Sequence, residues 1–179
     1  MALFHGVINS KALMKDTTLS MIVPSDDRKN IGFQGQPQLL ILLHGAGGSN
    51  YTWSKYSSIE RYTEPLNLIV LMPNIEFSFG LNMSNGLNYQ SYLGEELPQW
   101  AEKTFGLKLD RETTTIAGQS MGGCGYPYGT GLSQQIWKMW CFFRTAGAGR
   151  ISNRRTSVGR KYGTFQACLH VERFDFWQG

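Results

Sequence analysis

Residues Thr113 to Gly129 read TTTIAGQSMGGCGYPYG, an apolar run followed by a Gly-x-Ser-x-Gly turn at 118–122. The apolar run has the length of a buried strand. A serine held on a strained strand-to-helix turn needs small residues two positions to either side, because larger side chains would collide with neighbouring backbone. In a chain with 21 glycines the bare pattern could arise by chance, but the strand before it and Gly123 after it favour such a turn. The stretch therefore predicts an exposed Ser120 at the end of a strand.

Two further apolar runs have the same character. QLLILLHG at 38–45 and NLIVLMPN at 67–74 are continuous apolar runs of strand length, a pattern typical of strands buried on both faces. Between these strands, residues 51–65 and 89–107 have helical spacing. Strands that alternate with helices predict an α/β fold with a mostly parallel sheet flanked by helices. Such sheets place their functional sites at the carboxyl ends of the strands.

Prolines mark the boundaries of two further elements. KALMKDTTLSMIVPSD at 11–26 alternates enough to predict a strand that ends at Pro24. Pro98 falls within the second helical stretch, where it predicts a first turn or a kink because proline lacks the N–H that a helix interior needs.

A glycine-rich segment, HGAGG at 44–48, follows the first of the two apolar runs. Such a turn would let the N–H of Ala46 point into the site, where it could form a two-donor oxyanion hole with the N–H of Met121. A phosphate-binding loop is the alternative, but the segment lacks the glycine spacing and the Lys-Ser/Thr pair of nucleotide loops. His44 is a candidate base, although its place at the strand end favours a structural role. Trp53 is a candidate wall of an acyl pocket, with plain packing as the alternative.

Four sequence blocks together are more specific than the pentapeptide alone. They resemble the tributyrin esterase and S-formylglutathione hydrolase (esterase D) branch of the α/β-hydrolase fold, over about residues 1–123. In chain order, the blocks are LLHGAGGSNYTW at 42–53, NLIVLMPN at 67–74, LGEELPQW at 93–100 and TTTIAGQSMGG at 113–123.

The resemblance implies a serine carboxylesterase that hydrolyses short-chain acyl esters, or thioesters of the S-formylglutathione kind. The reaction would pass through an acyl-enzyme and use neither cofactor nor metal, so a small acyl ester is the expected partner. By the same resemblance, Ser120 is the nucleophile, and Ala46 and Met121 supply the oxyanion donors.

After Ser120 the chain departs from this pattern. In the α/β-hydrolase fold the nucleophile is followed first by an acid and then by a histidine. Here His170 precedes both Glu172 and Asp175, and the chain has no other histidine or acid after Ser120. One hypothesis is an unorthodox triad of His170 with Asp175 or Glu172. The preferred hypothesis is that the acid and base are missing, so that the chain as written is inactive.

The charge of the chain is concentrated in its tail. Residues 1–124 carry nine Lys or Arg against eleven Asp or Glu, whereas residues 125–179 carry eight against two. We therefore expect 1–124 to be the N-terminal part of an α/β-hydrolase domain, incomplete at its C-terminal end, and 125–179 to be an atypical, poorly ordered basic tail. A sheet that stopped at the nucleophile strand would leave that strand with an exposed edge. Trp and Arg interleave in the tail, so a non-enzymatic protein that binds nucleic acid is the alternative function, ranked behind the esterase.

Pro127 and the jump in charge motivate a further hypothesis, that the tail is a frameshifted translation. Shifted by one base, the codons for Trp137 to Phe143 are forced to encode Gly, Cys and Gly at three positions. With permitted codons on either side, the shifted frame gives a polar turn and a small-residue strand that resemble the family's segment after the nucleophile. The chain is therefore expected to leave the family's reading frame, or to be truncated relative to it, between about Gly123 and Leu132.

The sequence also argues against several other classes of protein. No apolar run approaches the ~20 residues of a membrane span, and residues 1–10 lack the layout of a signal peptide, which together predict a cytoplasmic protein. The three cysteines have no CxxC spacing, so neither a metal knuckle nor a disulfide framework is indicated. The sequence leaves the oligomeric state open.

Overall fold

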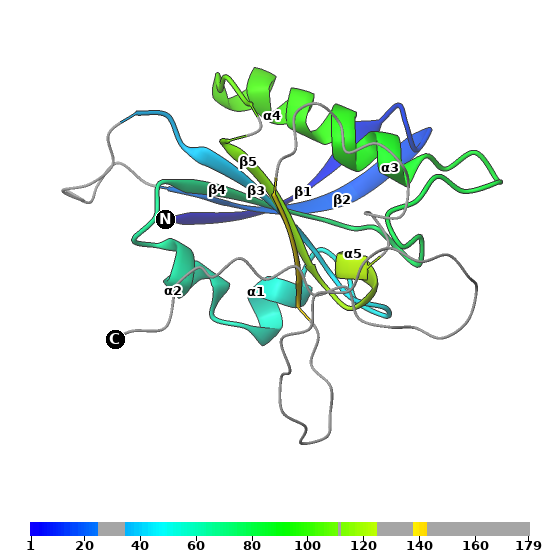
Figure 1. Ribbon diagram of the computed structural model, residues 1–179, viewed down its shortest axis with the longest axis horizontal. Helices are drawn as coiled ribbons and strands as arrows, with labels where there is room; N and C mark the ends of the chain where they lie inside the picture. Colours follow the sequence, from blue (N-terminus) through cyan, green and yellow to red (C-terminus); the bar gives the residue numbers. More distant parts are fainter. Residues whose placement is uncertain (25–34, 111, 125–137, 143–179) are drawn as a thin grey trace, which may run out of the picture.

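The computed structural model describes residues 1–24, 35–110, 112–124 and 138–142. These residues form a mixed sheet in the order β1-β2-β4-β3-β5-β6, with helices on both faces (Figure 1). The sheet's six strands are β1 (Ala2–Ser10), β2 (Lys15–Val23), β3 (Gln38–Leu43), β4 (Leu68–Pro73), β5 (Thr114–Gln119) and β6 (Lys138–Phe142).

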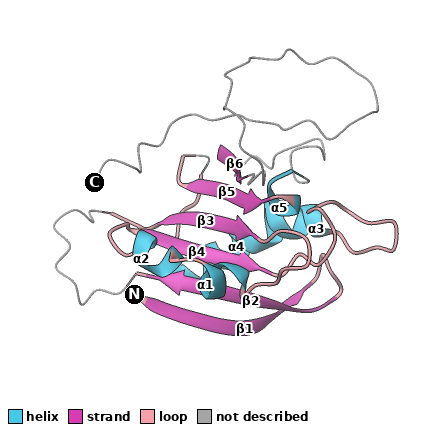
Figure 2. Ribbon diagram, turned by 90° about the horizontal axis from the view of Figure 1, so that it is seen from below, coloured by secondary structure: helices cyan, strands magenta, loops and turns pink. Residues whose placement is uncertain are grey.

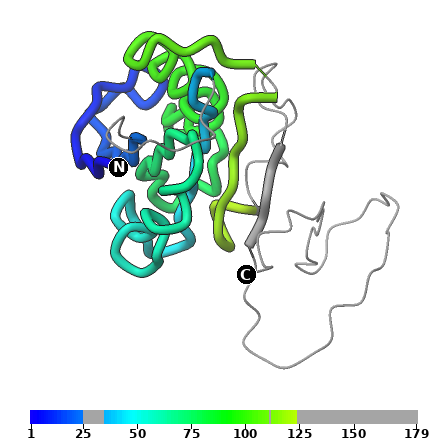
Figure 3. The backbone as a smooth tube through the Cα atoms, turned by 90° about the vertical axis from the view of Figure 1, so that its left-hand side faces the viewer, coloured from blue at the N-terminus to red at the C-terminus, as the bar shows by residue number. Residues whose placement is uncertain are grey.

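Most of the sheet is parallel, as the sequence predicts. The central strand β3 pairs in parallel with β4 on one side and with β5 on the other. The β1–β2 hairpin is antiparallel and adds to the sheet by an antiparallel pairing of β2 with β4. Figure 3 shows the hairpin and β5 at opposite sides of the molecule. Because β3, β4 and β5 are parallel to one another, their carboxyl ends lie at the same edge of the sheet.

Helices make the crossovers between the parallel strands. Figure 1 shows two short helices below the sheet, between β3 and β4, and a longer helical stretch above it, between β4 and β5. Pro98 lies in the first turn of the last helix of that stretch, which confirms the prediction for this residue. The helices are α1 (Thr52–Tyr56), α2 (Ile59–Thr63), α3 (Tyr89–Ser91), the π-helix η1 (Tyr92–Glu96), α4 (Leu97–Phe105) and α5 (Met121–Cys124).

Each face of the sheet has its own hydrophobic layer. Leu39, Ile41 and Leu43 of β3 pack into the larger layer, which includes buried residues of η1 and α4. Leu42 of the same strand packs into the smaller layer, which includes Trp53 of α1. This alternation explains why the strand reads as one continuous apolar run: both of its faces are buried.

The strand β5 does not form the edge of the sheet, contrary to the expectation from the sequence. Residues Thr115 to Gln119 pair in parallel with Lys138 to Phe142, so β6 occupies that position. The physical reason is that an unpaired strand edge presents a row of free N–H and C=O groups. The apolar and aromatic run KMWCF, at 138–142, is a sequence suited to pairing with such an edge.

The last residue of the π-helix η1, Glu96, contacts the turn of the β1–β2 hairpin. The N–H of Leu97 reaches the carbonyl oxygen of Tyr92, one residue farther than in an α-helix. The Glu96 carboxylate accepts hydrogen bonds from the Ser10 hydroxyl at 2.7 Å, the Lys11 N–H at 2.7 Å and the Ala12 N–H at 3.0 Å. Glu96 thus fastens the β1–β2 turn to the helices that cover the sheet.

Candidate active site

Ser120 lies on the turn that joins the end of β5 to the start of α5 (Figure 2). Its φ is +51°, in the left-handed region, and its side chain is exposed. A residue other than glycine in this region is strained, and such strain persists only where the surroundings impose it. The structure thus places Ser120 as the sequence predicts, at the carboxyl edge of the sheet.

The two glycines that flank Ser120 are required by sterics. A Cβ on Gly118 would lie 2.6 Å from the carbonyl carbon of Gly122, across the turn. A Cβ on Gly122 would lie 2.5 Å from the carbonyl oxygen of His44 and 2.6 Å from the Cβ of Leu43. All three distances are shorter than real Cβ contacts, so the Gly-x-Ser-x-Gly spacing follows from the tightness of the turn at Gly118 and from the close approach of Gly122 to the end of β3.

The glycine-rich segment at 44–48 runs beside Ser120. A Cβ on Gly45 would lie 3.6 Å from the Cβ of Ser120 and 3.3 Å from the carbonyl oxygen of Gln119. The N–H of Gly48 donates to the carbonyl of Gly45 at 3.0 Å, which closes a tight turn around Ala46. Ala46 and Met121 therefore belong to the two segments that meet at Ser120; their role as oxyanion donors stays a prediction.

His44 holds this segment in place. It is buried, and its Nε2 accepts a hydrogen bond from the backbone N–H of Ile75 at 3.0 Å. Because Nε2 is an acceptor, the ring proton lies on Nδ1, which donates to the carbonyl of Gly45 at 2.8 Å. Both ring nitrogens are thus engaged, and the geometry supports the structural role for His44 over the role of a base.

Trp53 anchors α1 to the end of β3. Its Nε1–H donates to the carbonyl of Leu43 at 3.0 Å, and its ring packs against the smaller hydrophobic layer. These contacts support the packing alternative for Trp53, and its role as a pocket wall stays a prediction.

The candidate acid and base lie outside the described residues. His170, Glu172 and Asp175 all fall in the range 143–179, as does most of the basic tail proposed to engage nucleic acid. No described residue hydrogen-bonds to the Ser120 hydroxyl. Among the described residues there is also no group of three His, Cys, Asp or Glu side chains that could hold a metal ion.

Some residues that shape the site carry no signal in the sequence. Ile75 acts through its backbone N–H, which every residue except proline has. Asn50 is buried and accepts from the Thr18 hydroxyl at 2.9 Å while it donates to the Ser20 hydroxyl at 2.7 Å. Only the position of Asn50 shortly after the glycine-rich segment could have pointed to a role in fixing that segment.

A strained, exposed serine after a central parallel strand, beside a glycine-rich turn at the carboxyl edge of the sheet, is typical of the α/β-hydrolase fold. Comparison with known sequences agrees with this class. The Esterase family model matches residues 10–125, and the chain belongs to this family.

Named relatives are similar over the same part of the chain. The acetyl esterase of Caldicellulosiruptor saccharolyticus is 31% identical in an alignment of 131 residues that covers 70% of this chain and 49% of that protein. The fluorophosphonate-binding serine hydrolase F of Staphylococcus aureus is 34% identical, with a TM-score of 0.60 over 68% of this chain and 48% of that one. The S-formylglutathione hydrolase of Staphylococcus aureus is 32% identical, with a TM-score of 0.57 and the same coverage.

The chain thus spans about half the length of the relatives that it matches. Among the described residues, none of the helices has the length and apolar character needed to cross a lipid bilayer.

Proposed function

We propose that this chain carries the nucleophile and the oxyanion donors of a serine carboxylesterase that acts on short-chain acyl esters or on thioesters such as S-formylglutathione. The observation that carries the proposal is Ser120: exposed, at a φ of +51°, and flanked by the segment that contains Gly45 and Ala46. The names of the relatives, an acetyl esterase and an S-formylglutathione hydrolase, support this class of substrate.

In the proposed reaction, the Ser120 oxygen attacks the carbonyl carbon of the ester as its proton is removed. The negative charge that develops on the carbonyl oxygen is stabilised by the N–H groups of Ala46 and Met121. The alcohol or thiol then leaves with a proton, and water hydrolyses the acyl group from Ser120. Each step needs a group that accepts and returns a proton.

No base for Ser120 is found among the described residues, since both nitrogens of His44 are engaged in fixing the glycine-rich segment. We propose that the acid and base are missing from the chain as written, which makes it inactive or nearly so. A triad removed from a folded hydrolase leaves a residual ~10³- to 10⁴-fold rate enhancement over water from the oxyanion hole and from binding.

Chemical rescue tests this proposal. A folded sample is treated with a fluorophosphonate probe, with and without added imidazole, and the modified residue is identified by peptide mass spectrometry. We expect slow labelling of Ser120 that imidazole accelerates, because free imidazole replaces the missing base. Ser120→Ala should abolish labelling, whereas Ser84→Ala, at an exposed serine distant in the sequence, should preserve it. A folded sample that stays unlabelled in imidazole would contradict the proposal.

The unorthodox triad predicts a different result. If His170 serves as the base, His170→Ala should abolish labelling in the absence of imidazole, and imidazole should have little effect on the unmodified chain. Equal labelling of the chain and of His170→Ala eliminates that alternative.

A further inference from the structure

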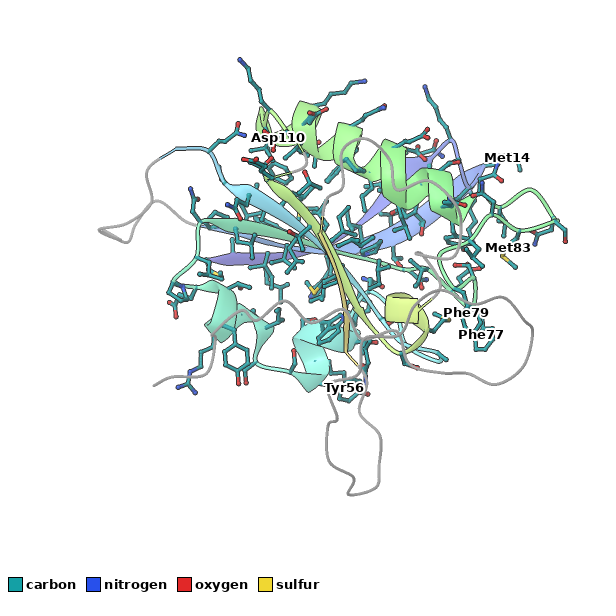
Figure 4. All side chains as sticks on the ribbon, viewed as in Figure 1. Met14, Tyr56, Phe77, Phe79, Met83 and Asp110 are labelled. Carbon is teal, nitrogen blue, oxygen red and sulfur yellow. The ribbon has the colours of Figure 1, made fainter. Side chains whose placement is uncertain are left out.

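A hollow lies beside the glycine-rich turn, and Gly47 and Gly48 of that turn form part of its lining. Its walls come from β1, from the turn and from α1, and Tyr56 projects at its α1 end (Figure 4). The residues that matter here are His5, Gly48, Ser49, Tyr51, Lys55 and Tyr56.

The described side chains that line this hollow include a cation and hydrogen-bond donors but no carboxylate. The lining contains one lysine, one histidine and several hydroxyl groups, and none of its described residues is Asp or Glu. The Lys55 ammonium lies 5.2 Å from the centre of the Tyr56 ring, a cation–π contact that holds the charge at the wall. Ammonium, imidazole and hydroxyl groups are hydrogen-bond donors, so the hollow suits a ligand with anionic oxygen atoms.

His5 is oriented by a chain of hydrogen bonds that runs through the buried residues Asn50 and Ser20. The Thr18 hydroxyl donates to the Asn50 side chain, and the Asn50 amide donates to the Ser20 oxygen. The Ser20 hydroxyl, which is fully buried, forms a hydrogen bond with His5 Nδ1 at 2.7 Å.

The other ring nitrogen of His5, Nε2, has no described hydrogen-bond partner. The His5 ring also lies 4.6 Å from the Tyr51 ring, centre to centre. The exposed His5 imidazole is thus linked through Ser20 to the buried side chain of Asn50. The same Asn50 belongs to the loop that carries the glycine-rich turn, so hydrogen bonds through Ser20 connect that loop to His5 in the wall of the hollow.

One wall of the hollow is close to the turn that contacts Ser120. The hydrogen bond between the Gly48 N–H and the Gly45 carbonyl defines a four-residue turn, and the ends of such a turn lie less than about 7 Å apart. Gly45 is beside Ser120, and Gly48 lines the hollow. We infer that this hollow binds a carboxylate on the leaving group of the ester or thioester substrate, with Lys55 and His5 as its partners. This inference rests on the proposed function.

The test compares two ligands that differ in one charge. The probes are 4-acetoxybenzoate and its neutral methyl ester, and their dissociation constants for the Ser120→Ala chain are measured by NMR titration at low salt. We expect the carboxylate to bind more tightly than the methyl ester, with Lys55→Gln weakening the carboxylate about threefold and leaving the methyl ester unchanged. Lys55→Arg should restore the preference.

Lys103→Gln, which removes an exposed lysine from α4, is the matched control and should change neither constant. Equal binding of the two ligands, or equal loss of both in Lys55→Gln, overturns the inference. Because the readout is binding, its outcome is separable from the esterase proposal. If the carboxylate binds more tightly but Ser120 is not labelled, the carboxylate site stands and the esterase proposal fails. If Ser120 is labelled but the two ligands bind equally, the esterase proposal stands and the carboxylate site fails.

Discussion

The carbonyl oxygen of His44 lies 2.5 Å from the point that a Cβ on Gly122 would occupy. The end of β3 and the turn after β5 are therefore in direct backbone contact, with no room for a side chain between them. His44 is also the residue that binds the N–H of Ile75, after β4. Three neighbouring strand ends thus converge on one buried residue beside Ser120.

Gly122→Ala should destabilise the fold and disturb Ser120. The added methyl group would meet backbone atoms, which cannot rotate away, so a cost of about 1–3 kcal/mol in the free energy of unfolding is expected. Urea denaturation measures the cost. Gly6→Ala is the control, because a Cβ there meets nothing within 4 Å, and it should be close to neutral. Equal stability of the two variants would show that the turn and β3 are not in contact.

His44→Phe should also destabilise the fold, by a different mechanism. The phenyl ring keeps the approximate size of the imidazole but removes both nitrogens, which leaves the Ile75 N–H without its partner and the Gly45 carbonyl with only the Gly48 N–H. A buried group left unsatisfied costs about 1–3 kcal/mol. Thermal denaturation gives the stability change, and fluorophosphonate labelling reports on Ser120. Unchanged stability would refute the structural role of His44.

Glu96→Ala should loosen the N-terminal hairpin. The carboxylate accepts from two backbone N–H groups and one hydroxyl of the β1–β2 turn, and loss of these bonds is expected to cost about 2 kcal/mol. Glu95→Ala, at the exposed neighbouring position, should change stability by less than about 0.5 kcal/mol. Hydrogen exchange should also become faster at the N–H groups of Lys11 and Ala12. Equal effects of the two substitutions would argue against the contact.

Asp110 should make stability depend on pH in the acid range. It lies before β5, at the opposite end of that strand from Ser120 (Figure 4). Hydrogen bonds from the Thr113 N–H, the Thr113 hydroxyl and the Glu112 N–H lower the pKa of its carboxyl. A lowered pKa means that the ionised form stabilises the fold above the ordinary Asp value of about 3.9, and that this stabilisation is lost as the pH falls through the lowered pKa.

The comparison that isolates this effect is between the chain and Asp110→Asn. We expect Asp110→Asn to have the lower melting temperature at pH 7, and the difference between the two to shrink as the pH approaches 3. A difference that stays constant from pH 7 to pH 3 would rule out a contribution from the ionised carboxyl.

The parallel strands were predictable because a strand that is buried on both faces consists mostly of apolar residues. Strands β3, β4 and β5 read as apolar runs since both of their faces contact hydrophobic layers. Strand β2 ends at Val23, directly before Pro24, as predicted. Strand β1 was not predicted: much of it is exposed, and its turn into β2 uses Met14 at a φ of +52° rather than the glycine or asparagine that marks such turns.

Only those parts of the candidate site where sterics restrict the type of residue could be predicted from the sequence. Gly118 and Gly122 mark the position of Ser120 because no other residue fits there. The break between α1 and α2 and the π-helix at Tyr92–Glu96 were not foreseen, since helical spacing is similar on either side of each irregularity. The contact of His44 with Ile75 was equally hidden, because it uses a backbone group.

The hydrogen bonds between Glu96 and the β1–β2 turn also matter for folding during synthesis. The partners of Glu96, residues 10–12, precede it by 84 to 86 positions. During synthesis the N-terminal hairpin therefore leaves the ribosome well before the carboxylate that secures it exists. Contacts between such distant segments form slowly, so the turn of the nascent hairpin stays without these hydrogen bonds until Glu96 has been synthesised.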